Sequence, residues 1–304
     1  MQRGGRLVSC WFASGVLACG VAAAAETPPD IQGIWTSGTL TPFERPTQLP
    51  QGDHSEQQRA ATEKFWAAGH KPGEVGRDND AFIDQDLKIL PNGQASLVVE
   101  PADGKVPLRP EAARRRDFNL TSFDTYETMS QWDRCITREP TPMFPGVYNN
   151  SYQIVQVPGY VLIVAEMIHD ARIIPIDRTG HADPRVRSWG GDSLGHWEGK
   201  TLVVDTTNFN DRGWIATAQN SSVRGVPVSE QLHIVERFTP LDHDTMQYEI
   251  TIDDPVNYTA PWKIAYPLAR DDKYQVFEYA CHEGNRAIEL ILGGARAQER
   301  VTTR

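Results

Sequence analysis

Short runs of β-branched and aromatic residues, separated by turn residues, fill the chain from Tyr148 onward. Tight turns at residues 157–160, 198–200 and 242–244 join several of them. Runs joined in this way pair antiparallel, and many short strands lose their exposed edges by forming a sandwich or a closed barrel. We therefore expect a mainly β fold, an antiparallel barrel or sandwich, with the lipocalin type among the candidates. The expected strands are residues 152–157, 160–166, 172–176, 201–206, 232–238, 246–252, 262–266 and 274–280.

Periodicity refines this expectation at three places. Residues 246–252 alternate apolar and polar side chains, so one face should pack in the core and the other should meet water or a polar lumen. After Cys281 the spacing becomes helical, which predicts a C-terminal helix over about residues 285–300. Residues 27 to about 117 are rich in Pro, Gly and charge and contain one helical candidate, residues 55–68.

The first 25 residues resemble a cleavable secretion signal. A basic start with Arg3 and Arg6 precedes an apolar run over 7–21 and four alanines, the order typical of such signals. An uncleaved anchor and lipidation at Cys19 are the alternatives, and bulky Leu17 disfavours the second. We expect cleavage after residue 25, a periplasmic or secreted location, and a single β-rich domain over residues 26–304.

The net charge of the chain limits the classes of molecule that it can bind. The whole chain has a formal charge of −10, and without Arg3 and Arg6 it keeps 28 basic against 40 acidic residues. An acidic surface without a basic cluster repels phosphate backbones and anionic lipids. We therefore expect no nucleic-acid partner and no integral membrane contact, and the sequence carries no signal for an oligomeric state.

Two cysteines remain after signal removal, Cys135 and Cys281. A single pair in an oxidising compartment is most simply a disulfide. The alternative is a reactive thiol beside His282, but adjacent residues in a strand point to opposite faces, which disfavours that dyad.

The segment 166–172 holds the densest group of reactive side chains. Within it His169 is the candidate general acid or base, Asp170 or Glu166 its orienting carboxylate, and Arg172 the stabiliser of negative charge. The alternative is structural: an Asp170–Arg172 ion pair that closes a hairpin, with His169 in solvent.

A second group of candidates lies outside that segment. Asp192 is expected to join the same cleft, with His196 and Trp197 as substrate-binding residues, and Tyr148 and Asn149 as hydrogen-bonding groups at its mouth. The tetrapeptide at 191–194 matches the GDSL esterase signature. It follows no apolar strand, and the sequence lacks the partner motif Asp-x-x-His, so we interpret it as a chance match.

Metal and cofactor motifs are weak. A metal would need His169, His196, His233 or His282 to converge with carboxylates, and no pair has the close spacing of a zinc motif. Glycine-rich phosphate loops are also missing from the sequence. We therefore expect no metal and no organic cofactor.

Four words that fall in order along the chain resemble those of an uncharacterised family of secreted bacterial proteins. The resemblance transfers no activity and no catalytic residue. It implies one folding unit from Ile31 to the C-terminus. The words are DRCITR (133–138), EMIHDARIIP (166–175), GHWEGKTLVVDTTNF (195–209) and EYACHEGN (278–285).

The leading hypothesis is a secreted, cofactor-independent hydrolase, lyase or isomerase that uses acid–base chemistry on a small neutral or cationic molecule. The alternative is a lipocalin-like protein that holds a small apolar ligand without catalysis, and a third is a structural envelope protein. Gathering of His169, Asp170, Arg172 and Asp192 in one cleft would favour the enzyme, whereas an apolar lumen would favour the carrier.

Overall fold

The computed structural model describes residues 27–47, 60, 90, 92–138, 143–146, 149–217 and 221–302. The expected signal over 1–25, Tyr148 and, apart from Ala60, the helical candidate 55–68 lie outside the described residues. The strands are β1 (Gly33–Thr36), β2 (Val98–Glu100), β3 (Ser151–Val157), β4 (Tyr160–Ala165), β5 (Ala171–Pro175), β6 (Asp192–Glu198), β7 (Thr201–Thr207), β8 (His233–Pro240), β9 (Thr245–Asp253) and β10 (Trp262–Arg270).

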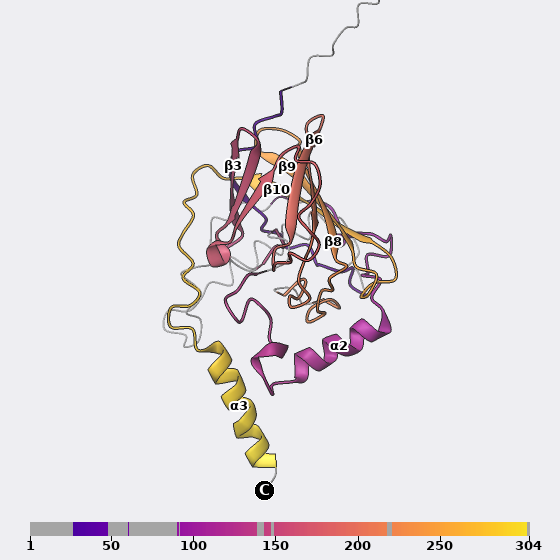
Figure 1. Ribbon diagram of the computed structural model, residues 1–304, viewed down its shortest axis with the longest axis vertical. Helices are drawn as coiled ribbons and strands as arrows, with labels where there is room; N and C mark the ends of the chain where they lie inside the picture. The colour runs from indigo at the N-terminus through magenta and orange to yellow at the C-terminus, as the bar shows by residue number, and fades with distance from the viewer. Residues whose placement is uncertain are drawn as a thin grey trace, which may run out of the picture.

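The strands form a mainly β, antiparallel, nearly closed barrel, as expected. Their order around it is β5-β4-β3-β1-β10-β9-β8-β7-β6, and β2 pairs with β10 beside this path. The strands gather into one body in Figure 1, where α2 and α3 lie outside one end. The three turns foreseen in the sequence join β3 to β4, β6 to β7 and β8 to β9.

Two strand expectations need correction. The strand expected over 274–280 is wrong, because this segment has no regular structure: Tyr274 packs edge to face on Phe277 and its hydroxyl donates to Glu166. Conversely, β1, β2 and β6 were not foreseen. β1 and β2 have only four and three residues, and β6 carries Gly195 and polar side chains, so none of them has a long apolar run.

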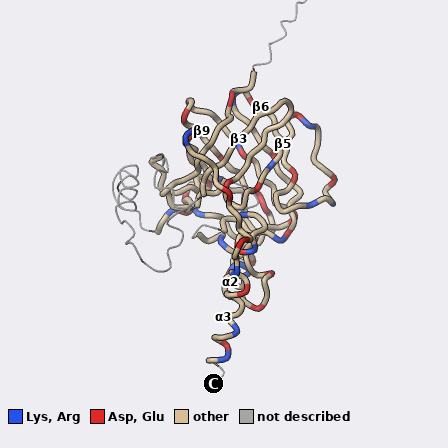
Figure 2. The backbone as a smooth tube through the Cα atoms, turned by 90° about the vertical axis from the view of Figure 1, so that its left-hand side faces the viewer, with Lys and Arg blue, Asp and Glu red and all other residues tan. Residues whose placement is uncertain are grey.

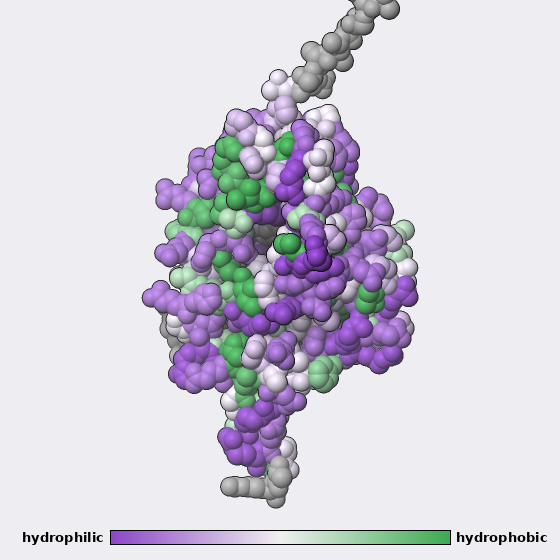
Figure 3. All heavy atoms as spheres, in the orientation of Figure 1, coloured by the Kyte–Doolittle hydropathy of each residue, from purple (hydrophilic) through white to green (hydrophobic). Residues whose placement is uncertain are grey.

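One continuous apolar core fills the barrel. The inward residues of β9, Met246, Tyr248, Ile250 and Ile252, are all 0 % exposed, and the alternating residues between them are partly exposed. This confirms the alternation expected from the sequence. Hydrophilic residues cover most of the face in Figure 3, where hydrophobic residues gather in separate groups.

The barrel is closed only weakly between its two end strands, β5 and β6, a line we call the seam. A single parallel bridge joins Ile176 to Gly195, and the Asp177 amide donates to the Gly195 carbonyl at 2.9 Å. A Cβ at Gly195 would stand 2.7 Å from Ile176 Cδ1 and 2.9 Å from Ile174 Cγ2. Glycine therefore lets β5 approach β6 here.

The helices α2 and α3 lie outside the barrel. The C-terminal helix α3 (Ala287–Thr302) confirms the expectation, whereas α2 (Pro110–Thr121) was not foreseen, although proline suits the first turn of a helix. Arg296 of α3 pairs with Asp124, just beyond α2, at 3.2 Å. Figure 2 shows acidic and basic residues interspersed along both helices. In the described part of the chain, neither helix has the length and apolar composition that crossing a bilayer requires.

The disulfide between Cys135 and Cys281 is present, with the two Cα atoms 5.6 Å apart. It joins positions 146 residues apart and ties the irregular segment before α3 to the segment that precedes Arg138. Such a long closed loop lowers the entropy of the unfolded chain.

Candidate functional site

A pocket of about 440 Å³ opens beside the seam, where β5 and β6 begin and are not yet paired. We call it the seam pocket. The segments 136–138 and 188–191 and the end of β4 complete its wall. Its apolar lining includes Ile136, Ile163, Met167, Ile173 and Trp189, and its polar lining includes Thr137, Arg138, Asp170, Arg172, Asp192 and Ser193.

Arg172 enters the pocket from β5 and is neutralised from across the barrel. Its guanidinium forms two bonds to the fully buried carboxylate of Glu236 on β8, the Nη2–Oε1 bond being 3.0 Å long. The Tyr248 hydroxyl donates to the same carboxylate at 2.5 Å. Burial opposes the charge of Arg172, but Glu236 outweighs it and raises the pKa of the guanidinium. The expected alternative, an Asp170–Arg172 ion pair, is wrong, because Arg172 pairs with Glu236 instead.

Arg138 is the second arginine that lines the pocket, and it is 3 % exposed. Its backbone is held firmly: the carbonyl accepts from Gln131 Nε2 at 3.1 Å and from Thr217 Oγ1 at 2.9 Å, and the amide donates to Asp170. Within the described ranges, its three guanidinium nitrogens have no hydrogen-bond partner. A buried charge without a partner is rare in folded proteins because it is costly, so this position is suited to bind a hydrogen-bond acceptor from another molecule.

Asp170 faces the same cavity from the turn before β5. It accepts from the Thr137 hydroxyl and from the Arg138 amide. Burial removes water from this carboxyl and raises its pKa, and the two hydrogen bonds offset the shift only in part. A carboxyl of this kind in a cleft can exchange a proton with a bound molecule.

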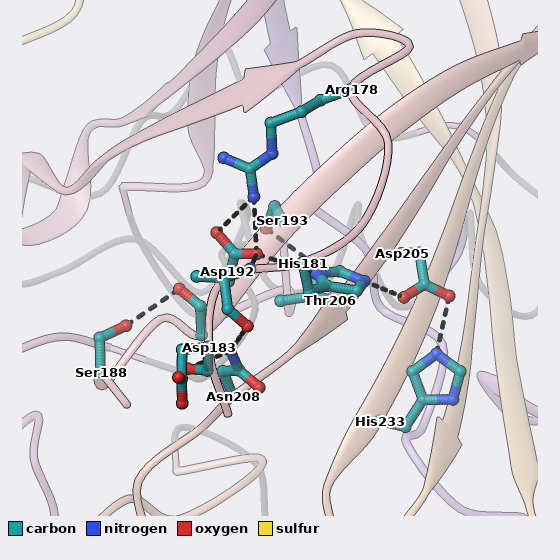
Figure 4. A network of polar contacts seen from close by, with 12 residues as sticks. Arg178, His181, Asp183, Ser188, Asp192, Ser193, Asp205, Thr206, Asn208 and His233 are labelled. Atoms are coloured by element: carbon teal, nitrogen blue, oxygen red, sulfur yellow. Dashed lines mark hydrogen bonds and ion pairs between the residues drawn. The ribbon is translucent and has the colours of Figure 1, made fainter. Parts of the chain in front are cut away.

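Asp192, at the start of β6, belongs to a chain of polar contacts that leads away from the pocket (Figure 4). Its carboxylate accepts from Arg178 at 2.9 Å and lies 3.0 Å from His181 Nδ1. On the other side of that ring, His181 Nε2 lies 2.8 Å from one oxygen of Asp205, and His233 Nε2 lies 2.7 Å from the other. Burial alone would raise the pKa of Asp192, but the Ala182 amide, His181 and Arg178 together hold it below its usual value.

The GDSL word does not form an esterase nucleophile. Ser193 is 6 % exposed, and its hydroxyl shares a 2.9 Å hydrogen bond with the Thr206 hydroxyl on the paired strand β7. In the described residues no histidine bonds to Ser193, so the general base that activates a serine is missing from its side.

The expected catalytic residues are divided between two places. Asp170, Arg172 and Asp192 line the seam pocket, whereas His169 does not. His169 is exposed and its Nδ1 donates to the Tyr279 carbonyl at 3.0 Å. Glu166 is fully buried and accepts from Asn149 and from the Tyr274 hydroxyl.

Three of the expected substrate-binding residues, Asn149, His196 and Trp197, lie outside the pocket lining, and Tyr148 lies outside the described residues. Asn149 is occupied by its bond to Glu166. His196 is exposed and contacts Glu198 at 3.2 Å, and Trp197 packs against the core from its edge.

Sequence reasoning missed Arg138, Glu236 and His181. Glu236 had a detectable signal, because it falls in the inward register of β8 between Ile234 and Phe238, where a charge is expensive. Arg138 and His181 had none, since segments without regular periodicity carry both.

Across the described ranges, no group of three or more His, Cys, Asp or Glu side chains is arranged to hold a metal ion. Comparisons with protein-family models, with curated proteins and with solved structures found no match to this chain. The functional proposal therefore rests on the geometry of the site.

Proposed function

We propose that this protein binds a small molecule in the seam pocket. The observation that carries the proposal is a buried arginine, Arg138, whose guanidinium has no partner among the described residues and which lies in the wall of a cavity lined by both apolar and polar side chains. A volume of about 440 Å³ falls in the range of small-molecule sites. Such sites combine apolar surface with a few fixed polar groups, and Arg138, Asp170 and Arg172 supply them here.

Catalysis on that molecule is the second candidate. It is favoured by Asp170, whose desolvated carboxyl has a raised pKa and which lines the cavity together with Arg138 and Arg172. This carboxyl would act as general acid or base, and Arg172 would stabilise negative charge, in a hydrolase, lyase or isomerase reaction without a cofactor. Turnover that Asp170→Asn abolishes, while ligand binding persists, would distinguish the enzyme from the carrier.

The location outside the cytoplasm is also a proposal, supported by the basic and apolar start of the chain and by the disulfide. Disulfides persist in oxidising compartments. Cell fractionation followed by sequencing of the mature N-terminus tests it, and Glu26 is the expected first residue.

The binding proposal is tested with the neutral fluorescent probe N-phenyl-1-naphthylamine. Ala171 is exposed at the pocket wall, so Ala171→Trp should fill the cavity without disturbing the core. The matched control Ala297→Trp adds the same side chain on the outside of α3. We expect saturable fluorescence with the native protein and the control, and at least a tenfold loss of affinity in Ala171→Trp. Equal binding by all three proteins would refute a site in the seam pocket.

A further inference from the structure

We infer that the ligand of the seam pocket carries a carboxylate group and that the guanidinium of Arg138 binds it. This inference rests on the proposed binding function and names the ligand class. The net negative charge of the chain suggested a neutral or cationic ligand. The inferred ligand is an anion instead, because the nearby charge of Arg138, unpaired among the described residues, acts on it more strongly than the charge of the whole chain.

Four charged side chains line the pocket, and among the described residues two of them, Arg172 and Asp192, have counter-ions. Asp170 has no counter-ion in the described ranges but accepts hydrogen bonds from the Thr137 hydroxyl and the Arg138 amide. Arg172 is neutralised by the bidentate carboxylate of Glu236. Asp192 is held by Arg178 and His181. In the part of the chain that the structure describes, Arg138 has neither an ion pair nor a hydrogen bond to its guanidinium.

The chain holds Arg138 in place without satisfying it. Three hydrogen bonds fix its backbone, through Gln131, Thr217 and Asp170. Its guanidinium lies against Gly146 so closely that a Cβ there would stand 2.2 Å from Nη2. The guanidinium is therefore held in position before any ligand binds, and the absence of a Cβ at Gly146 leaves room for it.

A carboxylate is the group that best suits this arrangement. The guanidinium offers parallel N–H donors that match the two oxygens of a planar carboxylate. Ile136, Met167 and Trp189 provide apolar surface for the rest of the molecule. The cavity of about 440 Å³ limits that molecule to a small organic acid rather than a peptide or a nucleic acid.

The test compares two isosteric probes, 2-naphthoate and the neutral 2-naphthamide, by direct calorimetric titration and by displacement of N-phenyl-1-naphthylamine. The native protein should bind the naphthoate at least about tenfold more tightly, since a hydrogen-bonded charge pair contributes that much or more. Arg138→Met should abolish this preference, so that the naphthoate binds no more tightly than the naphthamide. The control Arg114→Met, which removes the same charge from the outside of α2, should keep the preference.

Stability gives an independent measurement. Removing a buried charge without a partner should raise the melting temperature of Arg138→Met, whereas an arginine needed only for structure would lower it. If this variant does not fold, Gly146→Ala is used instead, because its Cβ displaces the guanidinium while the charge remains. The Gly146→Ala variant should likewise lose affinity for the naphthoate but not for the naphthamide.

Equal affinity for the two naphthalene probes, or no binding of the naphthoate, would overturn the carboxylate inference. Binding of N-phenyl-1-naphthylamine that is sensitive to Ala171→Trp would in that case still support the proposed function. If the naphthoate preference and the sensitivity to Ala171→Trp were both missing, the binding site itself would be refuted. Failure of the carboxylate inference can therefore be distinguished from failure of the proposed function.

Discussion

Two sides of the barrel are built differently. From β3 through β1, β10, β9 and β8 to β7, every strand pairs with a neighbour on each side, and apolar side chains fill the interior. At the seam, β5 and β6 meet at one bridge, and charged side chains gather where the strands separate. Continuous pairing leaves no backbone group for a ligand, whereas an interrupted sheet opens a cavity that polar side chains can line. The contrast indicates that the stability of the fold comes mainly from the continuous side and that ligand binding belongs to the seam.

The first prediction compares packing on the two sides. Phe238 on β8 is fully buried and stacks at 4.8 Å from the Tyr248 ring. Phe238→Ala should lower the free energy of unfolding by about 4 kcal/mol. Ile173 at the seam is 61 % exposed, and Ile173→Ala should change that free energy by less than about 0.5 kcal/mol. Urea denaturation measures both, and similar losses would contradict the contrast.

The second prediction concerns the charge pair that joins the two sides. Glu236→Leu leaves Arg172 buried and unpaired, so the free energy of unfolding should fall by about 3 kcal/mol. Adding Arg172→Met should restore most of the loss, because the double variant buries no charge. The neighbouring pair Arg237–Glu198 serves as control: its two atoms are 2.8 Å apart but exposed, so Glu198→Leu should leave the free energy of unfolding nearly unchanged. A double variant no more stable than Glu236→Leu would contradict this account.

The third prediction opens the seam itself. Gly195→Val should push β5 away from β6, because Ile174 and Ile176 occupy the space that its side chain needs. We expect a loss of about 2 kcal/mol in the free energy of unfolding and faster hydrogen exchange at the Asp177 amide, which donates to residue 195. Gly190→Val is the control, since a Cβ at Gly190 would meet no described atom within 4 Å. Unchanged exchange at Asp177 would show that the bridge does not close the barrel.

The fourth prediction, with the smallest effect, uses pH. The folded pKa of Asp192 is lowered, so its contribution is present above its unfolded pKa of about 4 and is lost as pH falls through the folded value. Asp192→Asn should therefore lower stability at pH 7 by at most about 1 kcal/mol and flatten the acid limb of the stability curve. Asp170 has a raised pKa and contributes in the opposite sense, so Asp170→Asn should stabilise the protein at neutral pH. The same sign for both variants would contradict the assignment.

The local sequence pattern predicted much of the fold on the side of the barrel where the strands pair continuously. The alternation in 246–252 placed Met246 and Ile250 in the core, and the turn at 157–160 joined the strands expected around it. The strand expected over 274–280 did not form: Tyr274 packs on Phe277 and its hydroxyl donates to Glu166, and the segment pairs with no described strand. Strand formation needs a partner strand as well as a suitable run of side chains.

The candidate site was predicted only in part. Asp170 and Arg172 are two residues apart and reach the same pocket, as their spacing suggested. His169 lies directly before Asp170 in sequence but faces the Tyr279 carbonyl, because the backbone turns at that point, with a φ of 44°. Strand alternation places neighbouring residues on opposite sides, and the bend does not bring His169 round to the pocket.

Sequence alone determined the mainly β class, the alternating core positions, the C-terminal helix and the pairing of Cys135 with Cys281, because each depends on neighbouring residues or on a count. Only the tertiary structure decided that Arg172 pairs with Glu236, 64 residues away, and that, among the described residues, Arg138 remains without a partner beside them. A barrel brings its end strands together through the cumulative geometry of all the strands between them. The contents of the seam are therefore a property of the closed sheet, and no local stretch of the chain specifies them.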